Sequence, residues 1–326
     1  MNNPYGYING RVRMMRTALV EARAMDDVQN TLNYQEFLRQ ISETPLREDL
    51  GEATAQGAGL GQLDEALSRN YLKAISHLRS IATGQPAREI EAMLLRYDLQ
   101  NVKTLVRGVQ TGRAADDIVA GLIPAGTLPW SALQGAAQSA DVASLAQTLS
   151  VAGGKIGQIL RAAVSSGASS LLDLEVALDQ GYYRAVLSGV RGTNVRRYFT
   201  REIDIRNLLI ARQLRGAAPN VRYFIPGGRD VSEADFLRIA GGDNSVSAPD
   251  LGAILEAPDL GSSEAIARRL LDEASRNVAM ADALGPGVAL DYLRRKEQEI
   301  ARMRLIGRAK FYGLSKDELQ KELEGA

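Results

Sequence analysis

The sequence predicts an all-α protein, and composition and internal repetition are the two observations that predict it. Ala, Leu, Arg, Glu and Gln dominate, and these residues favour helices, whereas aromatic residues make up only 5% of the chain. The hydrophobic share of 45% and the charged share of 24% are ordinary for a soluble globular protein. A length of 326 residues exceeds what one hydrophobic core usually fills, so we expect two or three helical sub-cores.

Segments of the last third of the chain repeat segments of the first third at one constant spacing. Phe37 and Phe236 lie in similar short segments and stand 199 positions apart. The same spacing separates the Glu-Ala-Leu-Ser-Arg segment that ends at Arg69 from its counterpart that ends at Arg268. It also separates Asp98 from Glu297. Three matches at one spacing indicate a duplicated structural unit.

A middle copy lies between these two. Residues 63–74 match residues 174–185, and Asp98-Leu-Gln-Asn101 matches Asp204-Ile-Arg-Asn207. Downstream, Ile-Pro-Ala-Gly at 123–126 parallels Ile-Pro-Gly-Gly at 225–228, and Pro with Gly ends helices. We therefore predict three similar helical domains: 1–122 with an additional N-terminal helix, 123–225, and 226–326 with C-terminal helices. Each would hold a short helix containing Phe or Trp, then a Glu/Ala/Leu helix, then a long helix; the aromatic residues are Phe37, Trp130 and Phe236.

Helical periodicity predicts the individual elements. Apolar residues of 94–109 share one broad face, and residues 203–214 are apolar nearly all round, which is typical of a buried helix. Near the N-terminus, one helix is expected to place Ile8, Val12, Met15, Leu19 and Ala22 on a single stripe. At the other end, Ser315 and Glu318 have capping-box spacing and predict the start of a last short helix.

Two polar boxes interrupt the apolar faces of the long helices. Asp98 with Asn101, and Asp204 with Asn207, are spaced i, i+3 and therefore share a helix face. Such a pair could form a metal or general-acid site, or could bond the backbone ends of a neighbouring helix or an arginine such as Arg96 or Arg201. The copying of the box with its unit favours the architectural role. The third copy is incomplete, because Glu297 replaces Asp and Ile300 replaces Asn.

Charged clusters offer a second kind of candidate site. The arginines Arg11, Arg13 and Arg16 could contact an acidic partner, or could form a solvated helix face. The run from Arg294 to Glu299 is expected to be such a solvated face, with Arg295 and Glu299 paired across one turn. Equal totals of 39 basic and 39 acidic residues give no general attraction to nucleic acid, and no aromatic residues interleave with the arginines.

Motifs for catalysis and cofactor binding are missing or broken. Gly153-Gly154-Lys155 lacks the earlier glycine and the following Ser or Thr of a phosphate loop, and the glycines at 57–61 follow no predicted strand. The chain has no Cys and one His, His77, which sits in a helical segment and is expected to have a packing or surface role. We expect no catalytic residue, cofactor, nucleotide or metal. No segment resembles a secretory signal or a bilayer span.

Taken in order, the motifs resemble the C subunit of bacterial and archaeal V/A-type ATPases, whose eukaryotic relative is the d subunit of the vacuolar proton pump. The resemblance covers the whole chain, and each motif alone is short. The matching segments are Tyr5-x-Tyr7-x-Asn9-x-Arg11-Val12-Arg13, Phe37-Leu38, Ser42-Glu43-Thr44, Leu95-Arg96-x-Asp98-Leu99-x-Asn101, Ile205-x-Asn207-Leu208, Gly227-Gly228-Arg229 and Phe311-Tyr312-Gly313-Leu314.

The resemblance implies a pseudo-threefold funnel of three similar helical domains. Its base would sit on the membrane proteolipid ring and its mouth would receive the central stalk, at the cytoplasmic face of the membrane. It would be a non-catalytic link that transmits torque for ion transport and for ATP synthesis or hydrolysis. A generic helical protein-binding scaffold is the alternative interpretation. The residues leave open which of them face stalk or ring, whether protons or sodium ions move, and in which direction the complex runs.

Overall fold

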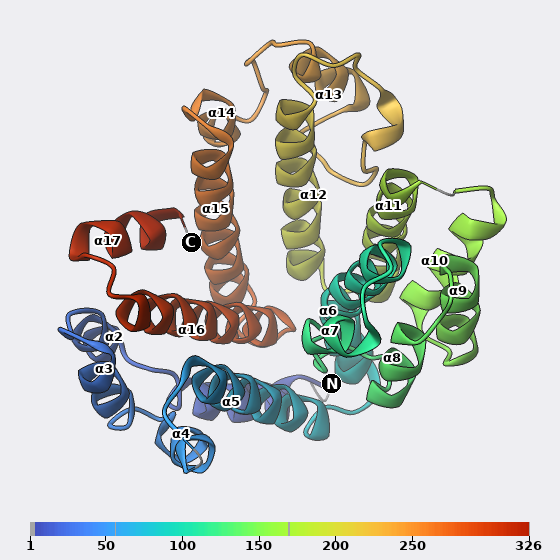
Figure 1. The fold of residues 1–326 in the computed structure, drawn as a ribbon. Helices are drawn as coiled ribbons and strands as arrows, with labels where there is room; N and C mark the ends of the chain where they lie inside the picture. The colour runs from blue at the N-terminus through green and yellow to red at the C-terminus, as the bar shows by residue number, and fades with distance from the viewer. Residues whose placement is uncertain (1–3, 56, 169, 326) are drawn as a thin grey trace. The chain divides into compact units, whose positions relative to one another are not determined.

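The computed structural model describes residues 4–55, 57–168 and 170–325. Over these ranges the chain forms seventeen α-helices and one 3-10 helix, and no β-strand (Figure 1). The prediction of an all-α fold is therefore confirmed. In the same ranges, none of the helices combines the length and apolar character that a bilayer span requires.

The helices form two compact units, and the first unit unites the two ends of the chain. One unit comprises Met1–Thr83 with Gly261–Ala326, and the other comprises Gly84–Leu260. The three-domain division of the sequence is a different kind of division, based on repeated segments, and it stays a prediction.

In the first unit, helix α16 (Gly287–Tyr312) packs along α5 (Leu60–Ser80) and also against α1, α3 and α17 (Figure 1). A glycine permits the close crossing, because a Cβ at Gly307 would overlap the side chain of Leu63 and press on the ring of Phe37. The other helices of this unit are α1 (Gly6–Arg16), α2 (Ala22–Gln29), α3 (Tyr34–Ile41), α4 (Arg47–Thr54), α17 (Lys316–Gly325) and nearly all of α15 (Leu260–Ala281).

The second unit contains two long helices, each with its own group of short helices. Helix α6 (Gly84–Gln110) packs most extensively on α11 (Leu171–Gly189) and also contacts α7 to α10, whereas α12 (Thr193–Gln213) packs on α13 and α14 (Figure 1). The shorter elements are α7 (Ala115–Ala120), α8 (Trp130–Ala137), α9 (Val142–Val151), α10 (Lys155–Ser165), η1 (Val221–Tyr223), α13 (Glu233–Ala240) and α14 (Pro249–Glu256).

The long helices α6, α12 and α16 differ in which part of the chain they pack against. Helix α6 packs against the short helices that follow it in the chain, and so does α12. Helix α16 contacts α17, the only described helix that follows it, and it also contacts α1, α3 and α5 at the beginning of the chain. The last long helix of the chain thus packs against the helices at its beginning, whereas α6 and α12 pack against helices that follow them.

Most predicted elements are present at the expected places. Helix α6 covers the predicted apolar segment 94–109, and both Phe37 and Phe236 are fully buried. The Ser315–Glu318 capping box is confirmed: the Glu318 side chain accepts from the Ser315 backbone N–H at 2.8 Å, at the start of α17. Trp130 is 37% exposed, and α8 buries Leu133, Ala136 and Ala137 instead.

The prediction of one N-terminal helix as far as Ala22 is wrong. Helix α1 ends at Arg16, and the Thr17 and Ala18 backbone N–H groups turn back to the carbonyls of Met14 and Met15. The Val20 backbone N–H donates to the Glu299 carboxylate at 2.6 Å. In a continuing helix the same N–H would donate to the carbonyl four residues earlier. Beyond the end of α1, a side chain from a distant part of the sequence thus takes the place of a helical hydrogen-bond partner.

Candidate functional site

The first polar box holds the loop that leads into α8. The Asp98 carboxylate on α6 accepts from the backbone N–H groups of Thr127, at 2.9 Å, and Leu128, at 3.0 Å, and from the Thr127 hydroxyl at 2.5 Å. One turn further on, Asn101 bonds Ile123 in both directions, donating to its carbonyl at 2.7 Å and accepting from its N–H at 2.8 Å. Helix α6 thus clamps both ends of the segment 123–128.

The second box repeats this arrangement on α12. The Asp204 carboxylate accepts from three successive backbone N–H groups, those of Arg229, Asp230 and Val231, each at 3.0 Å. Asn207 donates to the Ile225 carbonyl at 2.9 Å and accepts from its N–H at 2.8 Å. The clamped segment here is 225–231, which leads into α13.

Each clamp depends on a glycine in the loop. A Cβ at Gly126 would overlap the Asp98 carboxylate, and a Cβ at Gly228 would overlap the Asp204 carboxylate. Glycine therefore lets the loop backbone approach the carboxylate closely enough to donate several N–H groups. The Ile-Pro-x-Gly segments that marked the unit boundaries in the sequence are thus the segments that the boxes bind.

Burial and backbone donors act in opposite directions on the carboxylate of the second box. Burial raises the pKa of Asp204, while the backbone N–H groups of Arg229, Asp230 and Val231 oppose this by stabilising the carboxylate. Of the arginines considered as partners, Arg201 pairs with Asp230 and Asp250, and Arg96 lies over the Tyr97 ring at 5.9 Å. Among the described residues, no group of three or more His, Cys, Asp or Glu side chains could hold a metal.

The third copy of the box differs from both others. Glu297 pairs with Arg294 on its own helix at 3.3 Å, and Ile300 is buried. A buried pair beside these two positions makes a comparable contact with a distant backbone group: Glu299 accepts from the Val20 N–H, at 2.6 Å, and from Lys296, at 2.5 Å. Nearer the end of α16, Lys310 donates to the Thr31 carbonyl at 2.5 Å. The i, i+3 spacing of Lys296 and Glu299 was the only sequence signal for these residues.

The prediction that 294–299 is a solvated face is wrong. Arg294, Lys296 and Glu299 are all buried, and Arg295 pairs at 2.8 Å with Asp291, not with Glu299. Glu299 contacts the Val20 N–H of the N-terminal segment, and Arg294 pairs with Asp272 of α15 at 2.9 Å. The local sequence pattern could not show either contact.

The three N-terminal arginines bond within the chain. Arg16 forms an ion pair with the buried carboxylate of Asp291 at 2.6 Å, and Arg13 donates to the Ala283 carbonyl at 2.8 Å. Arg11 contacts His77 at 3.3 Å, which gives that histidine a partner on the surface. Together these contacts attach α1 to α5, to α16 and to the turn before α16. A contact of these arginines with another protein stays a prediction.

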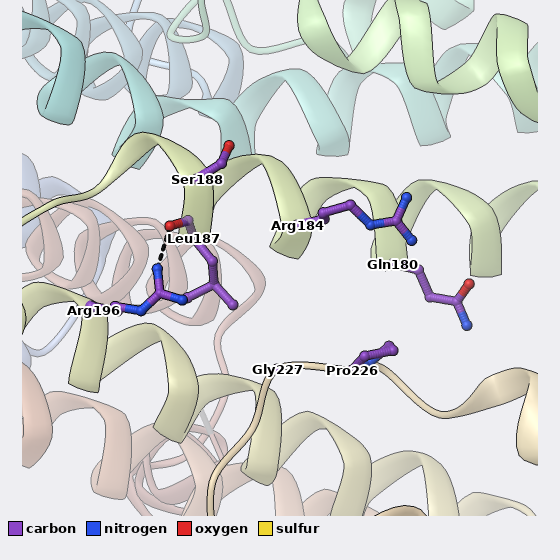
Figure 2. Close-up of a pocket in the computed structure, with 7 residues that line it drawn as sticks. All are labelled: Gln180, Arg184, Leu187, Ser188, Arg196, Pro226 and Gly227. Carbon is purple, nitrogen blue, oxygen red and sulfur yellow. Dashed lines mark hydrogen bonds between the residues drawn. The ribbon is translucent and has the colours of Figure 1, made fainter.

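A shallow cavity of about 480 Å³ lies between α11, α12 and the clamped loop 225–228. Figure 2 shows Arg184 and Arg196 on opposite sides of Leu187, with Pro226 and Gly227 below them. The sequence analysis proposed no binding role for Gln180, Arg184 or Arg196: the first two lie within the repeated segment 174–185, and Arg196 lies outside it. By contrast, Gly153 and Gly154 form the predicted loop between α9 and α10, without lining this cavity.

The chain matches the family described as ATP synthase (C/AC39) subunit over residues 8–322. The C subunits of two bacterial V-type ATP synthases are similar to it. The protein of Deinococcus radiodurans is 47% identical over 99% of this chain and 92% of its own length. That of Thermus thermophilus is 31% identical over 99% of both chains. The C subunit of the A-type ATP synthase of the archaeon Haloquadratum walsbyi is 25% identical over 97% of this chain and 97% of its own length.

The comparisons define a class of protein, the accessory helical subunits of rotary ATPases. The chain belongs to the ATP synthase (C/AC39) subunit family. The resemblance inferred from the sequence motifs is therefore confirmed, and so is the expectation of a non-catalytic part of such a complex.

Proposed function

We propose that this chain is the non-catalytic socket that couples the rotating central stalk of a V/A-type ATPase to the proteolipid ring of its membrane sector. Membership of the family supports a place in the rotary complex. The observation that carries the mechanical part of the proposal is the repeated clamp, in which a buried carboxylate and amide fix the loop after each of two long helices.

A coupling element must transmit torque without bending at its joints. The loop 123–128 joins α7 to α8, and the loop 225–231 joins η1 to α13. Both serve as joints, because side chains of a long helix, α6 or α12, hold them. Each joint is held by at least four hydrogen bonds from side chains that are at most 1% exposed. Buried hydrogen bonds with saturated acceptors resist deformation, because breaking one leaves an unpaired polar group in a low dielectric. Stiff joints of this kind suit a part that is turned from one side and loaded from the other.

The finer features of the proposal follow from the same interpretation. Three similar helical domains would surround a pseudo-threefold axis, with one end on the ring and the other open to the stalk. The chain would act as a peripheral component at the cytoplasmic face, in ion transport coupled to ATP synthesis or hydrolysis. It would carry no catalytic site, and the complex would supply the nucleotide and ion sites.

Removal and restoration of the chain test this proposal. Complexes stripped of the chain and reconstituted in vesicles should hydrolyse ATP without building an ion gradient, because stalk and ring no longer turn together. Adding the purified chain back should restore the gradient. Raised salt should weaken its hold, because rim contacts between charged side chains are screened. Stripped complexes that pump ions at the normal ratio to ATP consumed would show that the chain is not the coupling link, and would favour a helical scaffold.

A further inference from the structure

The second half of α11, the turn after it and the first part of α12 form a strongly basic segment on an otherwise neutral chain. Residues 180–201 contain five arginines and no Asp or Glu, although the whole chain has 39 acidic and 39 basic residues. The arginines are Arg184, Arg191, Arg196, Arg197 and Arg201. Asp179 and Glu202 flank this segment in the sequence, so the unbalanced charge is confined to the segment itself. An accumulation of one sign of charge attracts groups of the opposite sign.

The nearest acidic residues of α11 are already paired elsewhere. Glu175 forms an ion pair with Arg107 at 2.5 Å, and Asp179 forms one with Lys103 at 2.6 Å, both on α6. Among the described residues, Arg184, Arg191 and Arg197 form no ion pair, and all three are exposed. Arg196 donates only to the Leu187 carbonyl (Figure 2). Of the five arginines, only Arg201 is neutralised within the described part of the chain.

The cavity beside these arginines is held in shape by the second clamp. Its floor, Pro226 and Gly227, lies between the residues that Asn207 and Asp204 fix, Ile225 and Arg229. Gln180 holds the same loop from the other side, donating to the Phe224 carbonyl at 2.9 Å. Gly227 has a φ of +112°, and a Cβ there would lie 2.8 Å from the Leu187 side chain. A preformed floor reduces the ordering cost of binding.

We propose that this surface binds an acidic segment of another protein, with carboxylates on Arg184 and Arg196 and a small apolar side chain over Leu187 and Pro226. Guanidinium groups bind carboxylates with two parallel hydrogen bonds. Two arginines on either side of an apolar floor therefore select a segment by its negative charge and by the distance between its carboxylates. The inference rests on the proposed function, since it gives the socket one contact point for a neighbouring protein of the complex.

A protein fits this surface better than a lipid headgroup layer does. Binding to a membrane surface usually combines basic residues with large apolar side chains that enter the interface. Among the described residues, no exposed large hydrophobic side chain lies between Leu172 and Val221. The patch is therefore charged without an apolar anchor, which is typical of the polar rim of a protein–protein contact.

The variant R184Q/R196Q tests the proposal on the full-length chain. The matched control is R113Q/R276Q, which removes the same charge at two exposed arginines outside the patch. Binding of each labelled chain is measured to complexes stripped of the native protein, and to a blocked peptide of alternating glutamate and alanine. Vesicles with and without phosphatidylglycerol form a third arm. We expect the patch variant to bind complex and peptide about tenfold more weakly, with the control within about twofold of wild type.

The outcomes separate this inference from the proposed function. If wild-type chain fails to bind stripped complexes at all, the socket role fails, and the peptide arm still decides whether the patch takes acidic segments. If wild type binds and R184Q/R196Q binds equally well, the patch is not a contact and the inference is overturned. It is also overturned if only binding to phosphatidylglycerol vesicles falls, because the ligand is then a lipid. Circular dichroism of both variants shows that they are folded.

Discussion

At the scale of single residues, Asp98 and Asp204 do the same work at two places in the chain. Each is at most 1% exposed, and each is enclosed by backbone N–H groups of a loop that begins with Ile-Pro. Their neighbours Asn101 and Asn207 exchange two hydrogen bonds with the isoleucine of that loop. In each box the carboxylate accepts from loop N–H groups, and the amide satisfies both the N–H and the carbonyl of the isoleucine.

Replacing Asp98 or Asp204 with Ala should lower stability and leave no specific chemical defect. Each change strips partners from several buried donors, at about 1–3 kcal/mol for each unsatisfied group. For a chain of this size we expect Tm to fall by roughly 5–10 °C, measured by thermal circular dichroism. Asp27, exposed on α2, is the matched control, and Asp27→Ala should change stability by less than about 0.5 kcal/mol. An unchanged Tm with a loss of coupling would assign the boxes a functional role instead.

The loop glycines provide a test from the opposite side of the clamp. Gly126→Ala and Gly228→Ala would each drive a methyl group into the bound carboxylate, so we expect destabilisation of about 1–3 kcal/mol in urea unfolding. Gly135, inside α8 with open space around its Cβ position, is the control. Gly135→Ala should stabilise by up to about 1 kcal/mol, because alanine favours the helix. Equal effects at all three positions would contradict the clamp.

Buried tyrosines predict how the protein responds to alkali. Burial raises the pKa of Tyr182 and Tyr183 well above the usual value, and raises the pKa of Tyr292 to about 12. A raised pKa contributes stability that is complete below the unfolded value of about 10 and is lost as the pH rises through the folded value. Tyrosinate absorbance should therefore show a late fraction that appears only as helical circular dichroism is lost. Tyr292→Phe should remove part of that fraction. Ionisation of every tyrosine before unfolding would refute this.

The polar boxes show which contacts of single residues could be predicted from the sequence. Their i, i+3 spacing and their copying predicted a polar pair within an apolar face, and the Ile-Pro-x-Gly segments stood out as boundaries. That each box binds the loop downstream of it required the fold, because 22 to 30 residues separate the partners in the first box. Glu299 and Lys310 were missed, since their partners lie 279 residues away in the sequence.

At the scale of elements, α16 attaches the last part of the chain to its first helices through buried charge. Arg16 on α1 reaches Asp291, and the Val20 N–H, just before α2, reaches Glu299, which also pairs with buried Lys296. The helical pattern predicted α16 itself, but it also predicted a solvated face at 294–299. Charged residues that a neighbouring helix covers are indistinguishable by spacing from those on a free surface, so only the packing could settle this.

Removing one partner of the Lys296–Glu299 pair should lower stability much more than replacing both partners with apolar residues. Both side chains are about 5% exposed, so Glu299→Ala leaves a buried ammonium and the Val20 N–H without a partner. We expect a loss of about 3–5 kcal/mol in chemical denaturation. The double variant Lys296→Met with Glu299→Leu removes both charges and should recover much of that loss. If the double variant is as unstable as the sum of the single changes, the pair is not coupled.

At the scale of the whole molecule, the repeats of the sequence and the units of the structure are offset. In the repeat, α16 is the long helix of the third copy and follows α6 with the sequence spacing of 199 positions that separates Asp98 from Glu297. In the structure α16 packs with α1, α3 and α5, so Met1–Thr83 and Gly261–Ala326 form one compact unit. Periodicity reports which segments are alike and not which segments touch, and the number of compact units therefore could not be read from the repeat.

This arrangement predicts that the first 83 residues cannot fold alone. Expressed by itself, the fragment 1–83 would expose the face of α5 that α16 covers, including the surroundings of Phe37 and Leu63, and would leave Arg16 and the Val20 N–H without partners. We expect little helical circular dichroism and no cooperative thermal transition. Co-expression with the fragment 261–326 should restore both, because the two segments share one core. The matched control is co-expression with 261–286, which ends before α16 and should restore neither. A cooperatively folded 1–83 fragment would instead favour a first domain that is contiguous in sequence, and the return of α16 to the N-terminal helices would then be an attachment between finished domains.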